Sequence, residues 1–94
     1  MQVHRGHFEE LESGAVPGFV MKVYVEGENF EGRAVPLQAR VGDQRVDQLF
    51  IAPDGSGFAG LLAETPNDGD RVFVRYADET ELATPIVFGP QVVG

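Results

Sequence analysis

The sequence contains no cysteine and no tryptophan, and its 2 histidines both lie near the start of the chain. Without cysteine the fold has no disulfide, no thiolate metal site and no cysteine nucleophile. Basic residues are scarce, because 7 lysines and arginines stand against 15 aspartates and glutamates, which gives a net charge of −8. Such a chain repels phosphates and anionic lipid headgroups, so we expect neither nucleic acid nor a membrane as its partner.

Long apolar runs are also missing. No stretch approaches the roughly 18 apolar residues of a membrane-spanning helix, and residues 1–12 lack the apolar centre of a signal peptide. We therefore expect a soluble protein, whose compartment the sequence leaves open. With 94 residues, the chain is long enough for one modest hydrophobic core.

What the chain does contain is alternation of apolar and polar residues with period two, the pattern of half-buried strands. It predicts strands at 19–26, 37–41, 44–51, 58–63, 71–77 and 82–88. Gly42-Asp43 has the length and composition of a two-residue hairpin loop, and Pro85 belongs at a sheet edge because it cannot donate to a ladder. Only residues 7–11 could form a single helical turn.

Six to seven short strands separated by turn residues predict an all-β, antiparallel sandwich or a small barrel. No internal repeat or linker divides the chain. We expect a single domain at 19–94, preceded by a partly flexible N-terminal segment at 1–18.

Four segments, in order, resemble the IPT/TIG domains. They are 23–30 with its G-x-N-F turn, the hairpin at 39–46, the P-x-x-G-x-x-V-x-V pattern at 66–74, and the closing strand at 85–88. The resemblance covers about residues 20–88 and implies an immunoglobulin-like β-sandwich. It departs from the family at 12–18, where the usual entry to the first strand is absent. Such domains serve as spacers, as dimerising or DNA-contacting parts of transcription factors, and as accessory modules of carbohydrate-active enzymes.

Aromatic residues supply the candidate core and one candidate surface. Phe19, Phe50, Phe58 and Phe88 lie within or beside apolar runs and are expected in the core, with Phe30 closing one end of the sandwich. Arg71, Phe73 and Arg75 share the other face of their strand from Val72 and Val74, and this pattern suits a patch that binds a protein. Alternatively, the arginine methylenes simply cover Phe73.

Two acidic turns are candidate cation sites. Asp54, Asp68 and Asp70 lie in glycine-bent loops whose oxygens could bind calcium, although aspartate before glycine is also ordinary turn chemistry. His4 and His7 with Glu9 and Glu10 form a possible zinc or nickel set, against which stands the mobility of a glycine-containing terminus.

Catalytic groupings are not evident. Ser13, Ser56 and Thr65 are the hydroxyls near turns, and none has a histidine close to it in the sequence. We expect a non-catalytic binding or structural module without a cofactor, engaging another protein, a neighbouring domain or a second copy through a strand edge or the Arg71–Phe73–Arg75 face. The alternative is a calcium- or carbohydrate-binding accessory module that uses the turn loops.

Overall fold

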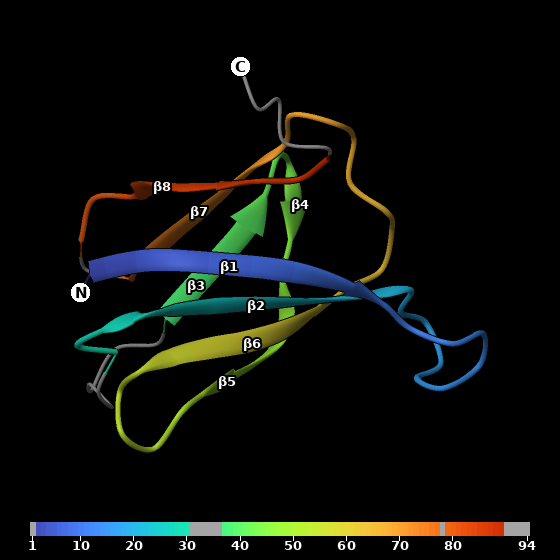
Figure 1. Ribbon diagram of the computed structural model, residues 1–94, viewed down its shortest axis with the longest axis horizontal. Coiled ribbons are helices and arrows are strands. Elements are labelled where there is room, and N and C mark those ends of the chain that lie inside the picture. The colour runs from blue at the N-terminus through green and yellow to red at the C-terminus, as the bar shows by residue number, and fades with distance from the viewer. Residues whose placement is uncertain (1, 31–36, 78, 90–94) are drawn as a thin grey trace.

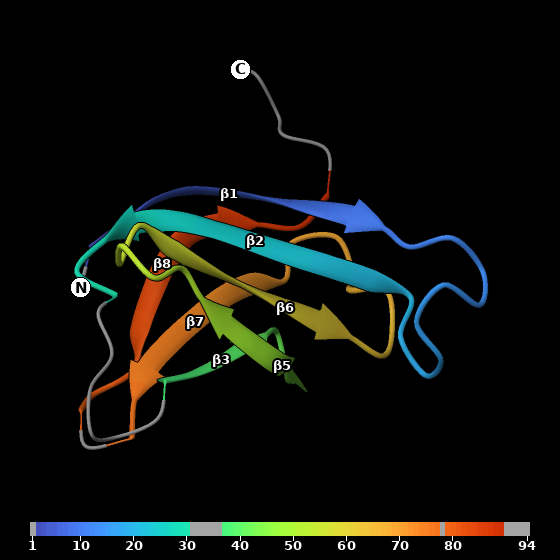
Figure 2. The same ribbon diagram turned by 90° about the horizontal axis from the view of Figure 1, so that it is seen from below.

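Figure 1 shows the computed structural model, which describes residues 2–30, 37–77 and 79–89. Within these ranges every regular element is a strand: β1 (Gln2–Glu10), β2 (Met21–Glu28), β3 (Leu37–Val41), β4 (Gln44–Arg45), β5 (Asp47–Ile51), β6 (Gly57–Leu62), β7 (Arg71–Tyr76) and β8 (Leu82–Val87). They form two antiparallel sheets, ordered β1-β2-β6-β5 and β4-β3-β7-β8 (Figures 1 and 2). The predicted all-β sandwich is confirmed.

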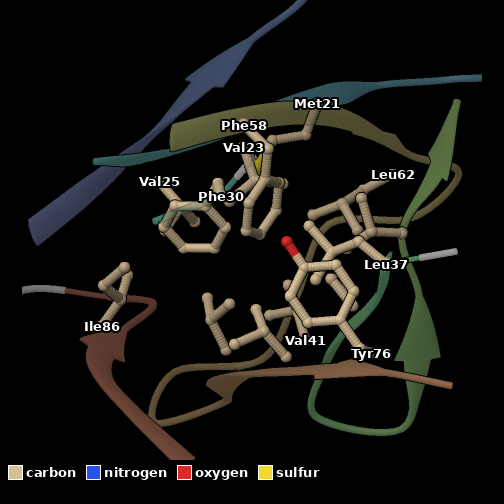
Figure 3. Close-up of a cluster of buried hydrophobic side chains, with 14 residues drawn as sticks. Met21, Val23, Val25, Phe30, Leu37, Val41, Phe58, Leu62, Tyr76 and Ile86 are labelled. Carbon is tan, nitrogen blue, oxygen red and sulfur yellow. The ribbon is translucent and has the colours of Figure 1, made fainter. Parts of the chain in front are cut away.

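One apolar cluster lies between the sheets, and most of its members come from the predicted alternating segments (Figure 3). The cluster is formed by Met21, Val23, Val25, Phe30, Leu37, Ala39, Val41, Val46, Phe58, Leu62, Val72, Val74, Tyr76 and Ile86. Full burial of one such large side chain stabilises the fold by about 1.5–3 kcal/mol. Since there are no disulfides, this packing is the main source of stability.

The end of the core near the β5–β6 turn is closed by an aromatic pair. Phe30 is fully buried and packs edge-to-face on Phe58, with ring centroids 5.4 Å apart and an interplanar angle of 68°. The backbone N–H of Phe30 donates to the carbonyl of Gly55 at 3.0 Å, which ties the end of β2 to this turn. The expectation that Phe30 closes one end is confirmed.

The predicted hairpin at Gly42-Asp43 is present, but the strand that follows it is not continuous. Val41 pairs with Gln44, and Gly42 has a φ of 58°, a conformation that glycine adopts without strain. The predicted strand at 44–51 is wrong in one respect: it divides at Val46 into β4, which pairs with β3, and β5, which pairs with β6 in the other sheet.

Packing around Val46 explains this crossing between the sheets. Its side chain is buried, and its N–H donates to the carbonyl of Ala39 at 3.0 Å, so the chain enters the core from the β3 side. On the β6 side Gly60 makes room, since a Cβ there would lie 2.2 Å from Cγ1 of Val46. The alternation of residues 44–51 does not predict that the chain crosses between the sheets, because the crossing depends on Gly60, which lies outside this segment.

The N-terminal segment contributes β1, which pairs with β2 along its whole length. The helical turn expected at 7–11 is therefore wrong, and the sandwich begins before residue 19. Phe8 packs edge-to-face on Phe88, the residue after β8, with centroids 5.0 Å apart. Gly6 approaches Ile86 of β8 so closely that a Cβ would lie 2.7 Å from Cδ1 of Ile86. β1 shows weak alternation because, as an edge strand, it buries only part of one face.

Candidate interaction surfaces

The two long sides of the sandwich differ in how they are closed. On one side the edge strands β1 and β8 lie against each other through Phe8, Phe88, Gly6 and Ile86. On the other side the edges are β5 in one sheet and β4 in the other (Figure 1). β4 has only two residues and pairs with Arg40 and Val41 of β3, and the N–H of Val46 continues this pairing to the carbonyl of Ala39. Among the described residues, Leu37 and Gln38 at the start of β3 have no strand on this side, whereas β7 pairs with the whole of β3 on the other.

A groove of about 710 Å³ lies on this open side. It is lined by Leu37, Gln38, Ala39, Arg40, Asp43, Arg45, Val46, Asp47, Gln48, Leu49, Arg75 and Glu81. One wall is the edge of β3, and the other is the start of β5. Its apolar lining residues are Leu37, Ala39, Val46 and Leu49, and the charged ones are Arg40, Asp43, Arg45, Asp47, Arg75 and Glu81.

The β5 wall is irregular. Gln48 has a φ of 51°, and the pairing of β5 with β6 shifts by one residue between Asp47 and Phe50. A left-handed conformation at a non-glycine residue costs roughly 1–2 kcal/mol and is uncommon. Such a bulge bends its strand and locally interrupts the ladder.

Ion pairs hold the charged border of the groove. Arg40 donates two hydrogen bonds to the Glu81 carboxylate, Nε to Oε2 at 3.0 Å and Nη2 to Oε1 at 2.8 Å. These bonds lower the pKa of Glu81 and raise that of Arg40. Elsewhere in the lining of the groove, Nε of Arg45 lies 3.8 Å from Oδ1 of Asp47. The Arg40 and Glu81 side chains are partly exposed and that of Arg45 is 88% exposed, so each pair contributes little to stability.

The structure places the predicted patch of Arg71, Phe73 and Arg75 on the outer face of β7. Phe73 is half-buried, and the guanidinium of Arg40, from the neighbouring β3, lies over its ring at 4.0 Å from the centroid. The side chain that covers Phe73 is therefore Arg40 rather than one of its two neighbours on β7. The contact between Arg40 and Phe73 depends on the register of β3 with β7, which pairs these two residues.

The two arginines of this patch have different surroundings. Nη1 of Arg71 donates to the carbonyl of Thr84 at 2.6 Å, and Nε of Arg75 donates to Oε1 of Gln38 at 3.1 Å. Among the described residues, no carboxylate lies within ion-pair distance of either guanidinium. Arg75 lines the groove, whereas Arg71 does not.

The acidic residues predicted for calcium are not brought together. Asp54 lies in the turn before β6, and Asp68 and Asp70 lie in the loop after it, so the length of the strand separates them. The carboxylates of Asp54 and Asp70 bond within their own turns. Oδ1 of Asp54 accepts from the N–H of Ser56 at 3.0 Å, and hydrogen bonds from the side chain and then the backbone of Ser56 lower the pKa of Asp54. Oδ2 of Asp70 accepts from the N–H of Asn67 at 2.9 Å.

The N-terminal histidines also lie apart from each other. His4 lies at an irregularity of β1, with Nε2 3.8 Å from Oε2 of Glu28, while His7 stacks on Tyr24. The part of the chain that the structure describes contains no group of three histidine, aspartate or glutamate residues able to hold a metal ion.

The expected positions of two aromatic residues are wrong. Phe19 lies before β2, is half-buried, and is neither in the core cluster nor among the residues that pack against it. Phe50 was expected in the core, yet it is 66% exposed on the outer face of β5. The bulge at Gln48 shifts the alternation by one position, so that Leu49 and Ile51 pack on the core instead. Period-two patterning fails at such a bulge because it assumes unbroken alternation.

Comparison of the chain with protein-family models, with curated proteins and with solved structures found no match. Within the described ranges there is also no helix that is long and apolar enough to cross a membrane.

Proposed function

We propose that this protein is a non-catalytic binding module that accepts an extended segment of a partner protein in the groove between β3 and β5. The observation that carries the proposal is the short β4, because it leaves the start of β3, at Leu37 and Gln38, without a described strand on the side of the groove of about 710 Å³. An exposed edge offers backbone donors and acceptors to an incoming strand, and side-chain positions beside it select the sequence.

Charge and shape favour one kind of segment. Leu37, Ala39 and Leu49 give the groove an apolar floor for alternate side chains of a bound strand. At its border Arg75 donates a hydrogen bond to Gln38 and helps to lower the pKa of Glu81, while no described carboxylate lies within ion-pair distance of it. An acidic side chain on the segment would complete this arrangement, because an arginine–carboxylate pair can form two parallel hydrogen bonds. The segment is therefore extended, with alternating apolar residues and one acidic residue.

The resemblance of residues 20–88 to IPT/TIG domains is compatible with the same proposal, since spacer and dimerising roles of such domains are not catalytic. The calcium- or carbohydrate-binding alternative is less well supported, because Asp54 lies at the opposite end of β6 from Asp68 and Asp70. The groove, in contrast, brings together side chains from β3, β5 and β7.

A displayed library of random decapeptides tests the proposal and requires no assumption about the identity of the partner. Peptides selected on the intact protein should contain alternating apolar residues and an acidic residue. In NMR titrations they should shift the amide signals of Leu37–Ala39 and Leu49 most strongly. We expect Arg75→Gln, which removes the charge and keeps hydrogen-bonding capacity, to weaken binding about tenfold, the value of one charge-assisted hydrogen bond.

Arg71→Gln is the matched control, because Arg71 occupies the same face of β7 but lies outside the groove. It should leave peptide affinity unchanged. Equal losses in both variants, or peptide-induced shifts confined to β1 and β8, would overturn the proposal. If light scattering shows instead that the protein is a dimer and that Arg75→Glu dissociates it, the groove holds a second copy rather than a separate partner.

A further inference from the structure

The pairing of β3 has a gap beside the groove, opposite Leu37. The N–H of Val46 bonds to the carbonyl of Ala39, which places these two residues opposite each other where the antiparallel pairing of β4 with β3 ends. Two residues further on, an unbroken strand would place Gln48 opposite Leu37. Because the chain crosses to the other sheet after Val46, Gln48 lies in the irregular part of β5 instead.

The backbone of Leu37 is directed toward this gap. In an antiparallel ladder the N–H and C=O of one residue point to the same neighbouring strand, and successive residues alternate between the two neighbours. The carbonyl of Ala39 points to the β4 side, because it accepts from Val46. The N–H and C=O of Leu37, two residues earlier, point to that side as well. Among the described residues, no strand pairs with Leu37 there.

Side chains around the gap are apolar on the inner side and polar on the outer side. Leu37 is buried, and Leu49 packs against the core from β5. Gln38 is exposed, and its Oε1 accepts from Nε of Arg75 at 3.1 Å. Residues opposite each other on antiparallel strands project to the same face, and successive residues project to opposite faces. A bound residue opposite Leu37 therefore turns inward, and its sequence neighbours turn to the face that carries Gln38 and Arg75.

Charge on that outer face favours an acidic neighbour. No described carboxylate lies within ion-pair distance of Arg75. The nearby carboxylate of Glu81 is already engaged, since both of its oxygens accept hydrogen bonds from Arg40. A carboxylate brought to Arg75 by a bound segment can accept hydrogen bonds from the terminal nitrogens of its guanidinium.

Provided that the groove binds a segment, as proposed above, we infer that it recognises two adjacent residues, a large apolar residue and an acidic residue directly beside it. The N–H of the apolar residue donates to the carbonyl of Leu37, and its carbonyl accepts from the N–H of Leu37. Its side chain packs on Leu37 and Leu49, while the carboxylate of its neighbour reaches Arg75. An acidic residue two positions away turns inward to the apolar side, where a charge is costly.

Three capped heptapeptides built on threonine, a residue that favours strands, test this spacing. The first has Asp-Leu-Asp at its centre, the second has the same composition with Asp-Thr-Leu-Thr-Asp, and the third has Asn-Leu-Asn. Each is titrated into the intact protein while the amide signals of Leu37 and Leu49 are followed by NMR. We expect the first peptide to bind at least about fivefold more tightly than the other two, the effect of one charge-assisted hydrogen bond.

Two controls assign this preference to Arg75. The net charge of −8 by itself favours the uncharged asparagine peptide, so tighter binding of the first aspartate peptide requires a local positive group. In the Arg75→Gln protein the first and third peptides should bind equally. Arg71→Gln, at a residue outside the groove, should preserve the difference between them.

Methylation of the peptide backbone tests the pairing with Leu37. A methyl group on the leucine nitrogen removes the donor to the carbonyl of Leu37 and should weaken binding at least about fivefold. The same methyl group on the next residue of the peptide is the matched control. The N–H of that residue points away from β3, so its loss should change the affinity less than about twofold.

Equal binding of the two aspartate peptides, no effect of methylation at leucine, or no binding by any of the three peptides would overturn this inference. Loss of the preference in Arg71→Gln as well as in Arg75→Gln would also overturn it, because a general attraction of negative charge would then explain the result. The groove proposal survives these failures if library peptides still shift the amide signals of residues 37–39 and bind Arg75→Gln more weakly. If the library peptides also fail, both are wrong.

Discussion

Replacement of Gly60 by alanine tests the crossing of the chain between the sheets, the feature that opens the groove. A Cβ at this position would lie 2.2 Å from Cγ1 of Val46, where carbon atoms normally stay about 3.5–4.0 Å apart. The new methyl group has little room to move away from Val46, because this Cβ would also lie 3.2 Å from the carbonyl oxygen of Asp47 and 3.2 Å from Cδ2 of Leu49. We expect Gly60→Ala to lower the free energy of unfolding by about 1–3 kcal/mol, the usual cost of overpacking a core.

Val46→Ala separates this overlap from a general effect of alanine. Alone, it removes two buried methyl groups and should destabilise the protein by about 1–3 kcal/mol. In the double variant the new methyl at position 60 occupies the space that Val46 has vacated. The combined loss should therefore be at least about 1 kcal/mol smaller than the sum of the two single losses.

Urea denaturation followed by circular dichroism measures all three variants against the parent protein, with equal m-values as the check for two-state behaviour. Losses that add to within about 0.5 kcal/mol would refute the proposed overlap. So would a Gly60→Ala variant that is more stable than the parent by about 0.4–1 kcal/mol. That is the gain expected where alanine fits without strain and only the entropy of the unfolded chain changes.

Three further outcomes follow from other contacts. Thr84→Val should destabilise the protein by about 1–2 kcal/mol in thermal melts, because the buried hydroxyl donates to the carbonyl of Val72 at 2.7 Å; an unchanged melting temperature would contradict this. The lowered pKa of Glu81 means that its pairing with Arg40 stabilises the fold above the usual glutamate pKa and is lost as the pH falls through the folded-state value. The stability difference between the parent and Glu81→Gln should therefore shrink on acidification, whereas a constant difference would remove the pair as its cause. Millimolar calcium should leave the melting temperature unchanged, and a rise of several degrees that Asp70→Asn abolishes would establish a cation site after all.

Much of the architecture could be predicted from local patterns. Alternation in β2 and β7 identified their buried faces, and the glycine at 42 marked a hairpin that the structure contains. These features are local, because the side-chain period of a strand and the φ of a turn residue depend on neighbouring residues only. The buried position of Phe30 was also correctly anticipated.

The candidate surfaces were less predictable, because each is assembled by contacts between distant parts of the chain. Arg40 covers Phe73 through the register of β3 with β7, and Glu81 reaches Arg40 from the start of β8. The exposed position of Phe50 follows from the bulge at Gln48, which alternation does not report. Of the patch predicted on β7, Arg75 lines the groove, and the prediction included neither Arg40 nor Glu81, which line it as well.

By itself, the sequence determined that this chain forms a small, acidic, cysteine-free all-β domain held together by one apolar core. Composition and strand periodicity suffice for that conclusion, because both act through burial of one face of each strand. Only the tertiary structure decided which strands share a sheet, where the chain crosses between sheets, and which side of the sandwich is open. Those outcomes depend on how closely Gly60 and Gly6 allow their neighbours to approach, and such distances exist only once the sheets have packed.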